Sequence, residues 1–340
     1  MAIDTPAVHP LVLAPAALPT FAEFLERARR YAPTLRCYDD AMEYVAQRCR
    51  DLERQERLDE LFGSLGRPGA APQQAGVPQS GPRAGNGRAG AGLEALLRTR
   101  LYPYQQEGVV FAARAGRALL GDDMGLGKTV QALGFAELMA REFGARRTLI
   151  VCPASLKYQW KEEIERFTER SVAVVEGLSH QRRKVYAGAA DYLVVNYDVV
   201  FRDVEAIRQL QPDVVILDEA QRIKNWETRT ANSVKQIESP YALVLTGTPL
   251  ENRLEELYSI MQFVDCHRLG PVFRLRDTHQ VTEPDTGRVT GYRRLSEIGR
   301  TLQPVLLRRR KDEVELQLPE RTENTYFVPM TPAQWVPHEE

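Results

Sequence analysis

Clustered cysteines and histidines are missing from this sequence. It has four cysteines and five histidines in 340 residues, and none of the cysteines forms a Cys-x-x-Cys pair. Structural zinc sites and disulfide frameworks both require clustered ligands, so neither is indicated. The cysteines are expected to be free thiols in a reducing compartment.

A long apolar run is missing as well. No stretch approaches the roughly 18 consecutive apolar residues of a membrane-spanning helix. The N-terminal residues carry Asp4 but no early Lys or Arg, and Pro10, Pro15 and Pro19 interrupt their apolar stretch, which is unlike a secretory signal peptide. We therefore expect a cytoplasmic protein that does not associate with membranes.

The sequence also has no excess of one charge. Its 45 Lys and Arg residues nearly balance 46 Asp and Glu residues, which gives a formal net charge of −1. Global charge therefore does not attract a nucleic acid, and any nucleic-acid surface must be a local patch. The hydrophobic content of 43% is enough to build the core of one large domain or two smaller ones.

Two helical patterns occupy the N-terminal part of the chain. The first follows a capping-box sequence that begins at Thr20, and Pro33 ends it. The second begins at Asp39 or Asp40 and runs to about Gly63, with apolar residues along one face. Together they predict a small helical unit whose arginines are either solvated or in contact with a partner.

Residues 66–92 are rich in Gly, Ala, Pro and Gln and have almost no large apolar side chain. Such a segment cannot bury enough apolar surface to offset the entropy of ordering it, so we expect a flexible linker. The predicted organisation is a disordered N-terminus (1–18), a small helical unit (19–65), this linker (66–92), a main lobe (93–320) and a connecting segment (321–340).

From Leu93 to about Pro249, short apolar runs alternate with longer amphipathic stretches. Apolar strands separated by helices predict an α/β lobe with a mostly parallel sheet that is covered by helices on both faces. Ligands of such sheets bind at the carboxyl ends of the strands. The expected strands are 117–120, 148–152, 172–175, 192–196, 214–217 and 243–246.

A glycine-rich loop that ends in Gly127-Lys128-Thr129 connects the first of these strands to an expected helix over 129–141. Strand, loop and helix in this order are typical of a phosphate-binding loop. Glycines let backbone N–H groups approach phosphate oxygens, Lys128 neutralises their charge, and the Thr129 hydroxyl ligates Mg²⁺. The general motif has glycine where this chain has Asp122, so a glycine-rich turn without phosphate is the alternative that the loop alone leaves open.

The apolar strand 214–217 runs directly into Asp218-Glu219-Ala220-Gln221. Two adjacent carboxylates at the carboxyl end of a strand suit a nucleotide hydrolase, in which one holds Mg²⁺ and the next polarises the attacking water. We assign the metal role to Asp218 and the role of base to Glu219. The alternative is a helix start whose acids only face the helix dipole.

A further turn, Thr246-Gly247-Thr248, also follows an expected strand. Two hydroxyl groups around a glycine are suited to sensing a γ-phosphate, although so short a motif is weak by itself. After the glycine-rich loop and the acidic pair, in this order, it strengthens the prediction of a nucleotide hydrolase. An unrelated phosphate-loop enzyme such as a kinase is the competing prediction, and the acidic pair and this turn both count against it.

These motifs give the sequence a close resemblance to the N-terminal motor lobe of the Swi/Snf-type family, helicase-like ATPases of superfamily two that translocate on double-stranded DNA. The resemblance covers roughly Leu101 to Pro319. It implies a RecA-like P-loop fold, ATP and Mg²⁺ as cofactors, and double-stranded DNA as a partner that is bound largely without sequence readout. In this family an acid normally stands at the position of Asp122, so that departure is a family feature.

The resemblance also implies roles for individual residues. Gln105 is expected to read the adenine base, and Gln221 stands where most relatives have histidine. The basic stretch 307–312 resembles the family's brace toward a second lobe, although a solvated run of charges is the alternative. The implied sites are nucleotide contacts at Gln105, Asp122, Asp123, Met124, Gly125, Leu126, Gly127, Lys128 and Thr129, coupling residues at Gln221, Thr246, Gly247 and Thr248, and DNA contacts at Ser155, Trp160, Asn196 and Tyr197.

The sequence ends at Glu340, where the second RecA-like lobe of the family would begin. An arginine supplied across such a site is worth on the order of 10³ or more in rate, and the resemblance implies that it comes from that lobe. We therefore expect Mg-ATP binding with little turnover by this chain. The alternative is a nucleotide- and DNA-binding module that acts with a separate second lobe or another partner protein.

Overall fold

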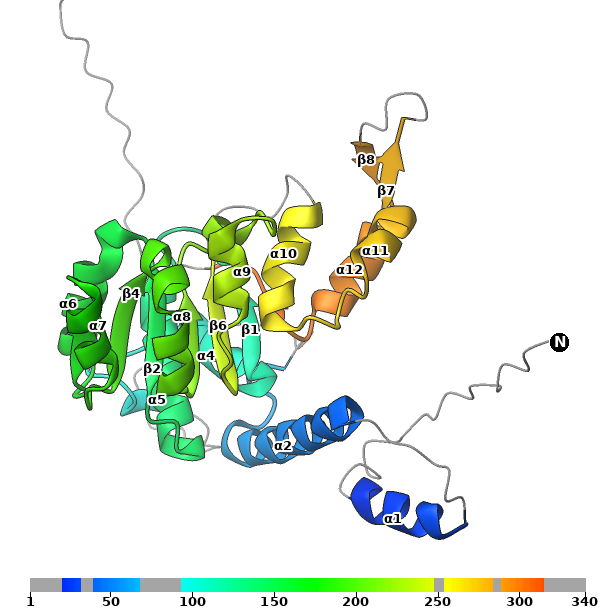
Figure 1. Cartoon of the computed structure of the whole chain (residues 1–340), viewed down its shortest axis with the longest axis horizontal. Coiled ribbons are helices and arrows are strands. Elements are labelled where there is room, and N and C mark those ends of the chain that lie inside the picture. The colour runs from blue at the N-terminus through cyan, green and yellow to red at the C-terminus, as the bar shows by residue number, and fades with distance from the viewer. Residues whose placement is uncertain (1–19, 32–38, 68–92, 248–253, 284–288, 315–340) are drawn as a thin grey trace, which may run out of the picture.

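The computed structural model describes residues 20–31, 39–67, 93–247, 254–283 and 289–314 (Figure 1). Its centre is a seven-stranded sheet with the strand order β3-β4-β2-β5-β6-β1-β9, in which every pairing is parallel. The predicted α/β lobe with a parallel sheet is therefore confirmed. The strands are β1 (Arg117–Leu120), β2 (Thr148–Cys152), β3 (Val172–Val174), β4 (Tyr192–Asn196), β5 (Val214–Leu217), β6 (Tyr241–Leu245) and β9 (Leu306–Leu307).

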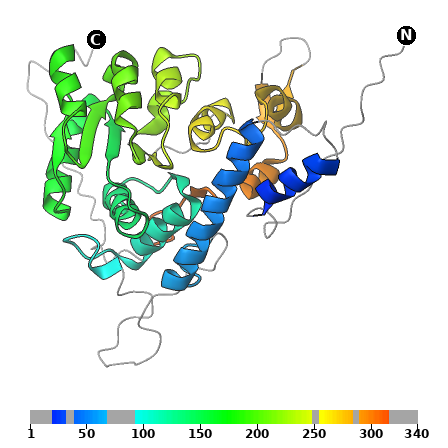
Figure 2. The same ribbon diagram turned by 60° about the horizontal axis from the view of Figure 1, so that its bottom comes forward.

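Helices cover both faces of the sheet, because strand side chains alternate between two apolar cores (Figures 1 and 2). In β1, for example, Ala118 and Leu120 belong to one core and Leu119 to the other. The first core includes residues of α4 (Pro103–Ala115), α5 (Lys128–Phe143) and α6 (Lys157–Phe167). The second includes residues of α7 (Ser179–Tyr186), α8 (Tyr197–Leu210), α9 (Arg229–Lys235) and α10 (Leu254–Val264).

Four of the six predicted strands have the observed bounds, and the other two differ slightly. The third strand ends at Val174, one residue early, and the last runs from Tyr241 to Leu245 instead of over 243–246. The helix after the glycine-rich loop extends one residue further at its start and two at its end than predicted. The sequence did not predict β9, because a two-residue strand has no pattern of its own and its partner β1 lies far away in the sequence.

The helix α2 (Asp39–Phe62), which follows α1 (Phe21–Tyr31), packs on the lobe. Leu58 and Phe62 belong to the same apolar core as α4, and Asp59 forms an ion pair with Arg114 of α4. The sequence placed this helix in a unit beyond a linker, but its second half shares the core of the lobe. Residues 68–92 of the predicted linker, and the predicted segments 1–18 and 321–340, lie outside the described residues.

After α10 the chain leaves the sheet and forms a projection (Figure 1). It then returns as β9 beside β1, at the edge of the sheet next to the glycine-rich loop. Among the helices of the described ranges, none is both long and apolar enough to cross a lipid bilayer. The projection consists of α11 (Val272–His279), the antiparallel hairpin of β7 (Gln280–Thr282) and β8 (Val289–Tyr292), and α12 (Leu295–Leu302).

Candidate active site

The three sequence motifs meet at one edge of the sheet. The glycine-rich loop follows β1, the acidic pair follows β5 and the Thr246-Gly247 turn follows β6, and these strands are neighbours in the order β5-β6-β1. A Cβ atom added at Gly247 would lie 2.8 Å from Cγ of Met124 and 3.4 Å from Nζ of Lys128. Only a residue without a side chain lets the turn approach the loop this closely.

The glycine-rich loop has the backbone shape that its glycines permit. Gly125 and Gly127 have φ angles of +90° and +69°, in the left-handed region that other residues rarely adopt. The helix α5 begins at Lys128, so the N–H groups of its first turn and the positive end of its dipole face the loop. Nζ of Lys128 donates to the carbonyls of Asp122 (2.7 Å) and Asp123 (3.1 Å).

The surroundings of Lys128 shift the pKa of its ammonium group in two opposite directions. Burial lowers the pKa of its ammonium group, whereas the charges of Asp122, Glu219, Asp218 and Asp123 act in the opposite direction. Lys128 therefore lies among four carboxylates. A bare polyanion would be repelled by these carboxylates, so the site suits an anion that arrives with its own cation.

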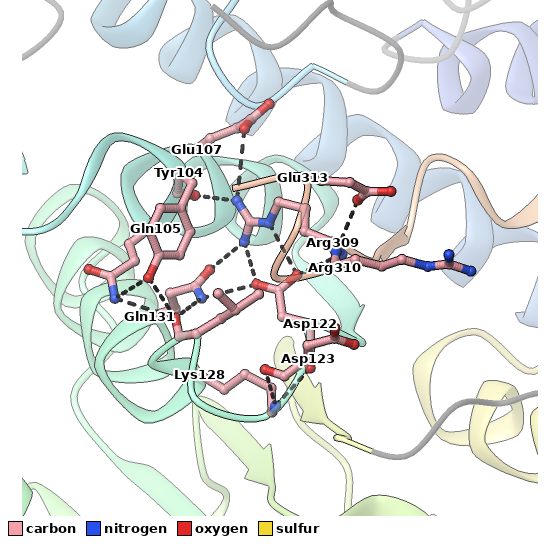
Figure 3. Close-up of polar contacts among 11 residues, drawn as sticks. Tyr104, Gln105, Glu107, Asp122, Asp123, Lys128, Gln131, Arg309, Arg310 and Glu313 are labelled. Carbon is pink, nitrogen blue, oxygen red and sulfur yellow. Dashed lines mark hydrogen bonds and ion pairs between the residues drawn. The ribbon is translucent and has the colours of Figure 1, made fainter. Parts of the chain in front are cut away.

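Asp122 is fully buried and binds Arg309 (Figure 3). Its Oδ1 accepts hydrogen bonds from the backbone N–H and Nε of Arg309, both at 3.1 Å, and its Oδ2 accepts from Nη2 of Arg309 at 2.5 Å and from Nε2 of Gln131 at 3.1 Å. Arg309 also donates to the Tyr104 carbonyl and to Oε1 of Gln131. The Asp122 carboxylate is therefore occupied by protein donors, and a contact between Asp122 and the nucleotide stays a prediction for its backbone.

The Asp122–Arg309 pair fastens the segment after β9 across the glycine-rich loop (Figure 3). The Asp123 N–H donates to the Arg309 carbonyl (3.0 Å), and the Lys311 N–H donates to Oδ2 of Asp123 (3.2 Å). The sequence singled out both the acid in the loop and the basic stretch, but it did not pair them. The missing signal was β9, which brings them together.

Gln105 lies under the tip of the glycine-rich loop. Its Oε1 accepts from the Tyr102 N–H (3.0 Å) and its Nε2 donates to the Leu126 carbonyl (3.4 Å), and a Cβ atom at Gly127 would approach Nε2 to 2.5 Å. Only 6% of its surface is exposed. The protein therefore engages both ends of the amide, and the adenine-reading role of Gln105 stays a prediction.

The acidic pair has a fixed geometry. Oδ1 of Asp218 accepts from the Glu219 N–H and Oδ2 accepts from Nε1 of Trp160, both at 2.9 Å. Burial, together with the charge of Glu219, raises the pKa of Asp218, and the bond from Trp160 opposes this shift. Oε2 of Glu219 accepts from Nε2 of Gln221 at 2.7 Å, so the predicted coupling residue touches the predicted base directly.

The predicted DNA contacts divide into two groups. Ser155 is exposed and Asn196 is partly exposed. Trp160 and Tyr197 are only 2% and 4% exposed, and the Tyr197 hydroxyl donates to the Asp218 carbonyl at 2.8 Å. Direct DNA contact by these two side chains does not fit such burial, because their polar groups hold Asp218 instead. The sequence motif alone does not show whether the side chain of such an aromatic residue points to the surface or to the interior.

The residues at this edge fit Mg²⁺ better than a metal that needs many protein ligands. Within the described residues, no group of three or more His, Cys, Asp or Glu side chains is placed to hold a metal ion. Mg²⁺ is usually held by one or two protein groups together with phosphate oxygens and water. Thr129, in the first turn of α5, and Asp218, after β5, can supply such groups.

The remaining coupling residues are only partly described. Thr246 is 1% exposed, and its N–H donates to the Leu120 carbonyl at 3.2 Å, which continues the pairing of β6 with β1. Thr248 lies outside the described residues.

A family model for the SNF2-related domain matches residues 104–339. The chain belongs to the SNF2-related family. It is 33% identical over 247 residues to the putative ATP-dependent helicase/translocase YwqA of Bacillus subtilis, which covers 69% of this chain and 26% of that protein. It is 28% identical over 271 residues to the DNA repair and recombination protein RAD54B of Gallus gallus, which covers 71% of this chain and 29% of that protein. The chain thus spans about a quarter of the length of these relatives.

Solved structures of the SNF2-related family have the same fold. The SWI2/SNF2 ATPase core of Sulfolobus solfataricus in complex with double-stranded DNA superposes with a TM-score of 0.56 at 30% sequence identity, over 63% of this chain and 45% of that one. A second structure, of the SWI2/SNF2 ATPase core domain of Sulfolobus solfataricus, gives a TM-score of 0.55 at 28% identity, over 72% of this chain and 50% of that one. The RecA-like fold and the resemblance read from the motifs are therefore confirmed.

Proposed function

We propose that this SNF2-related lobe binds Mg-ATP at the carboxyl ends of β1, β5 and β6 and hydrolyses it in a DNA-dependent manner, as part of a translocase or remodeller of double-stranded DNA. The observation that carries the proposal is the convergence of Lys128, the Asp218–Glu219 pair and Gly247 at this edge. Two observations support this convergence: Gly247 lies so close to Lys128 that a Cβ atom would meet Nζ, and the carboxylates of Asp218 and Glu219 act on the Lys128 ammonium group.

Each part of the site has a role in this proposal. The N–H groups of the loop and of the first turn of α5 bind the phosphates, and Lys128 exchanges its two loop carbonyls for phosphate oxygens. Thr129 and Asp218 would hold the metal, and a bound Mg²⁺ would neutralise the charge that develops on the phosphates. Glu219 accepts a proton from the attacking water, and Gln221 keeps its carboxylate in place.

The DNA surface is proposed at the same end of the sheet. Ser155 follows β2 and Asn196 ends β4, and β2 lies between β4 and β5 in the sheet. Polar side chains of this kind bind phosphate oxygens, which positions DNA without reading its bases. The solved core from Sulfolobus solfataricus is described in complex with double-stranded DNA, which supports this partner class.

The test is steady-state ATP hydrolysis with and without double-stranded DNA, together with binding of a fluorescent ATP analogue. The expected result is Mg²⁺-dependent nucleotide binding with slow hydrolysis, which DNA accelerates. The Lys128→Ala variant should lose nucleotide binding, because Lys128 is the cation whose Nζ donates into the loop and which the carboxylates of the site surround. Unchanged affinity in this variant would show that the nucleotide binds elsewhere.

The same experiment identifies the alternative function. A nucleotide- and DNA-binding module that acts with a partner chain would bind the analogue tightly without turnover. Hydrolysis would then appear when a second-lobe chain is added, since an arginine supplied across the site is worth on the order of 10³ or more in rate. Phosphate transfer to an acceptor other than water would contradict both functions.

A further inference from the structure

Asp218 is held by aromatic side chains from two other segments of the chain. Trp160 lies on α6, which follows β2, and donates from Nε1 to Oδ2 of Asp218 at 2.9 Å. Tyr197 is the first residue of α8, which follows β4, and donates from its hydroxyl to the Asp218 carbonyl at 2.8 Å. A residue proposed above to contact DNA precedes each helix, Ser155 before α6 and Asn196 before α8.

These bonds fix the carboxylate in one orientation. Oδ2 is bound by the indole of Trp160 and Oδ1 by the N–H of Glu219, so rotation of the carboxylate would break two hydrogen bonds. Each carboxylate oxygen has a second lone pair that remains available for a metal ion. Because the indole is buried, the bond to Asp218 is not weakened by competing water.

The helix that carries Trp160 has two differently exposed faces. Ser155 precedes this helix and is exposed, and Tyr158 in its first turn is 53% exposed. Trp160, two residues later, is 2% exposed and points to Asp218. A ligand that binds at Ser155 and shifts the start of α6 would therefore move the indole relative to the carboxylate.

We propose that Trp160 is a positioning residue that fixes the Asp218 carboxylate for Mg²⁺ and couples this carboxylate to binding of double-stranded DNA at Ser155, where the chain enters α6. This inference rests on the proposed function. It assigns to Trp160 an indirect role, because the side chain is buried and its Nε1–H is directed at Asp218.

The first test is the Mg²⁺ dependence of nucleotide binding in Trp160→Phe, which keeps an aromatic ring and removes the Nε1–H donor. Affinity for a fluorescent ATP analogue in EDTA should equal that of the wild type, because Lys128 and the loop are intact. The Mg²⁺ concentration that gives half of the affinity gain should rise about 10-fold, as is typical when a group that orients a metal ligand is lost.

A matched control separates this role from simple packing. Ile164 is fully buried one turn further along α6, so Ile164→Val loosens the packing of the same helix without touching Asp218. It should lower the melting temperature and leave the Mg²⁺ dependence unchanged. Tyr197→Phe, which removes one hydroxyl and keeps the ring, provides a second variant and should raise the Mg²⁺ requirement by a smaller factor, because its bond goes to the Asp218 backbone.

The coupling is tested by adding a short DNA duplex. DNA should tighten binding of the Mg-nucleotide to the wild type, and Trp160→Phe should lose this effect while its affinity for DNA without nucleotide stays the same. An unchanged Mg²⁺ requirement in both aromatic variants, an equal change in Ile164→Val, or a DNA effect that persists in Trp160→Phe would overturn the inference. If the wild type itself binds no nucleotide in Mg²⁺, the proposed function fails instead.

Discussion

At the residue scale, Glu219 combines an unfavourable backbone conformation with a fixed side chain. Its φ angle of +51° lies in the left-handed region, which costs a residue with a side chain roughly 1 kcal/mol. The bond from its N–H to Asp218 and the bond from Gln221 to its carboxylate hold it there. A strained acid that its neighbours hold in place is typical of a functional site.

We expect Glu219→Gln to separate nucleotide binding from hydrolysis. The amide keeps an acceptor for Gln221 but cannot take a proton from water, so DNA-stimulated hydrolysis should fall by about 10²–10⁴-fold. Affinity for Mg-ATP should change little. Both quantities can be measured in one preparation, and Glu227→Gln, an exposed acid in the loop that follows, is the matched control. Normal hydrolysis in Glu219→Gln would show that another group is the base.

The lowered pKa of Lys235 makes the free energy of unfolding depend on pH. Burial lowers the pKa of its ammonium group to about 8, and Nζ donates to Oγ of Ser259 (3.1 Å) and Oε1 of Gln262 (2.6 Å) on α10. Between pH 8 and 10.5 the unfolded chain keeps this proton and the folded chain releases it. The free energy of unfolding therefore gains a contribution that increases with pH across this window.

The Lys235→Met variant should lack this pH-dependent contribution. Relative to the variant, the wild type should become more stable by about 1 kcal/mol between pH 8 and 10, a figure reduced to allow for solvent screening of a half-buried group. Urea denaturation of both proteins at each pH measures the difference, in which the titration of other groups cancels. A constant difference would contradict the shifted pKa.

At the scale of elements, the segment after β9 holds the glycine-rich loop through contacts of residues 309–311 with Asp122 and Asp123; we call this segment the clasp. Arg309 and Asp122 are 187 positions apart, and both side chains are buried. Removing one partner of a buried ion pair leaves an uncompensated charge. The clasp therefore stabilises the loop only while both residues are present.

Arg309→Met should destabilise the protein by about 3–5 kcal/mol, because it leaves the Asp122 carboxylate buried without its main partner. Arg310→Met is the control: Arg310 is the exposed neighbour, and its loss should cost less than about 0.5 kcal/mol. In the double variant Asp122→Asn/Arg309→Met, the loss should be smaller than the sum of the two single losses. Additive losses would show that the two side chains do not act as a pair.

At the scale of the whole molecule, α2 is part of the lobe and not only an N-terminal appendage. Leu58 is fully buried in the core that includes α4, and Arg54 donates to the carbonyls of Arg114 (3.3 Å) and Ala115 (3.2 Å) near the end of α4. The other end of α4 carries Gln105, which touches the glycine-rich loop. A single helix, α4, therefore connects α2 to the glycine-rich loop.

Leu58→Ala should lower the free energy of unfolding of the entire lobe by about 2–5 kcal/mol, as expected for a cavity in a core. Leu52→Ala, at a partly buried position on the same helix, should cost clearly less. Chemical denaturation followed by circular dichroism measures both losses. If Leu58→Ala leaves the main transition unchanged, α2 folds independently of the lobe.

The sequence predicted correctly the features that depend on residues close to each other in the chain. The strand ending at Leu217, the acids after it and the loop ending at Thr129 are encoded by residues next to each other in the chain, because apolar runs and glycine-rich turns are local patterns. Their meeting at one edge was also predictable, since parallel strands place their carboxyl ends together.

The sequence by itself determined the α/β lobe, most of its strands and the motifs that meet at the carboxyl edge of the sheet. Only the tertiary structure decided that Asp122 holds Arg309, that Trp160 and Tyr197 face Asp218, and that α2 packs on α4. Each of these contacts joins segments that are distant in the chain, and the direction of a side chain depends on what packs around it. Local sequence patterns specify which elements form, whereas burial among distant elements decides which side chains meet.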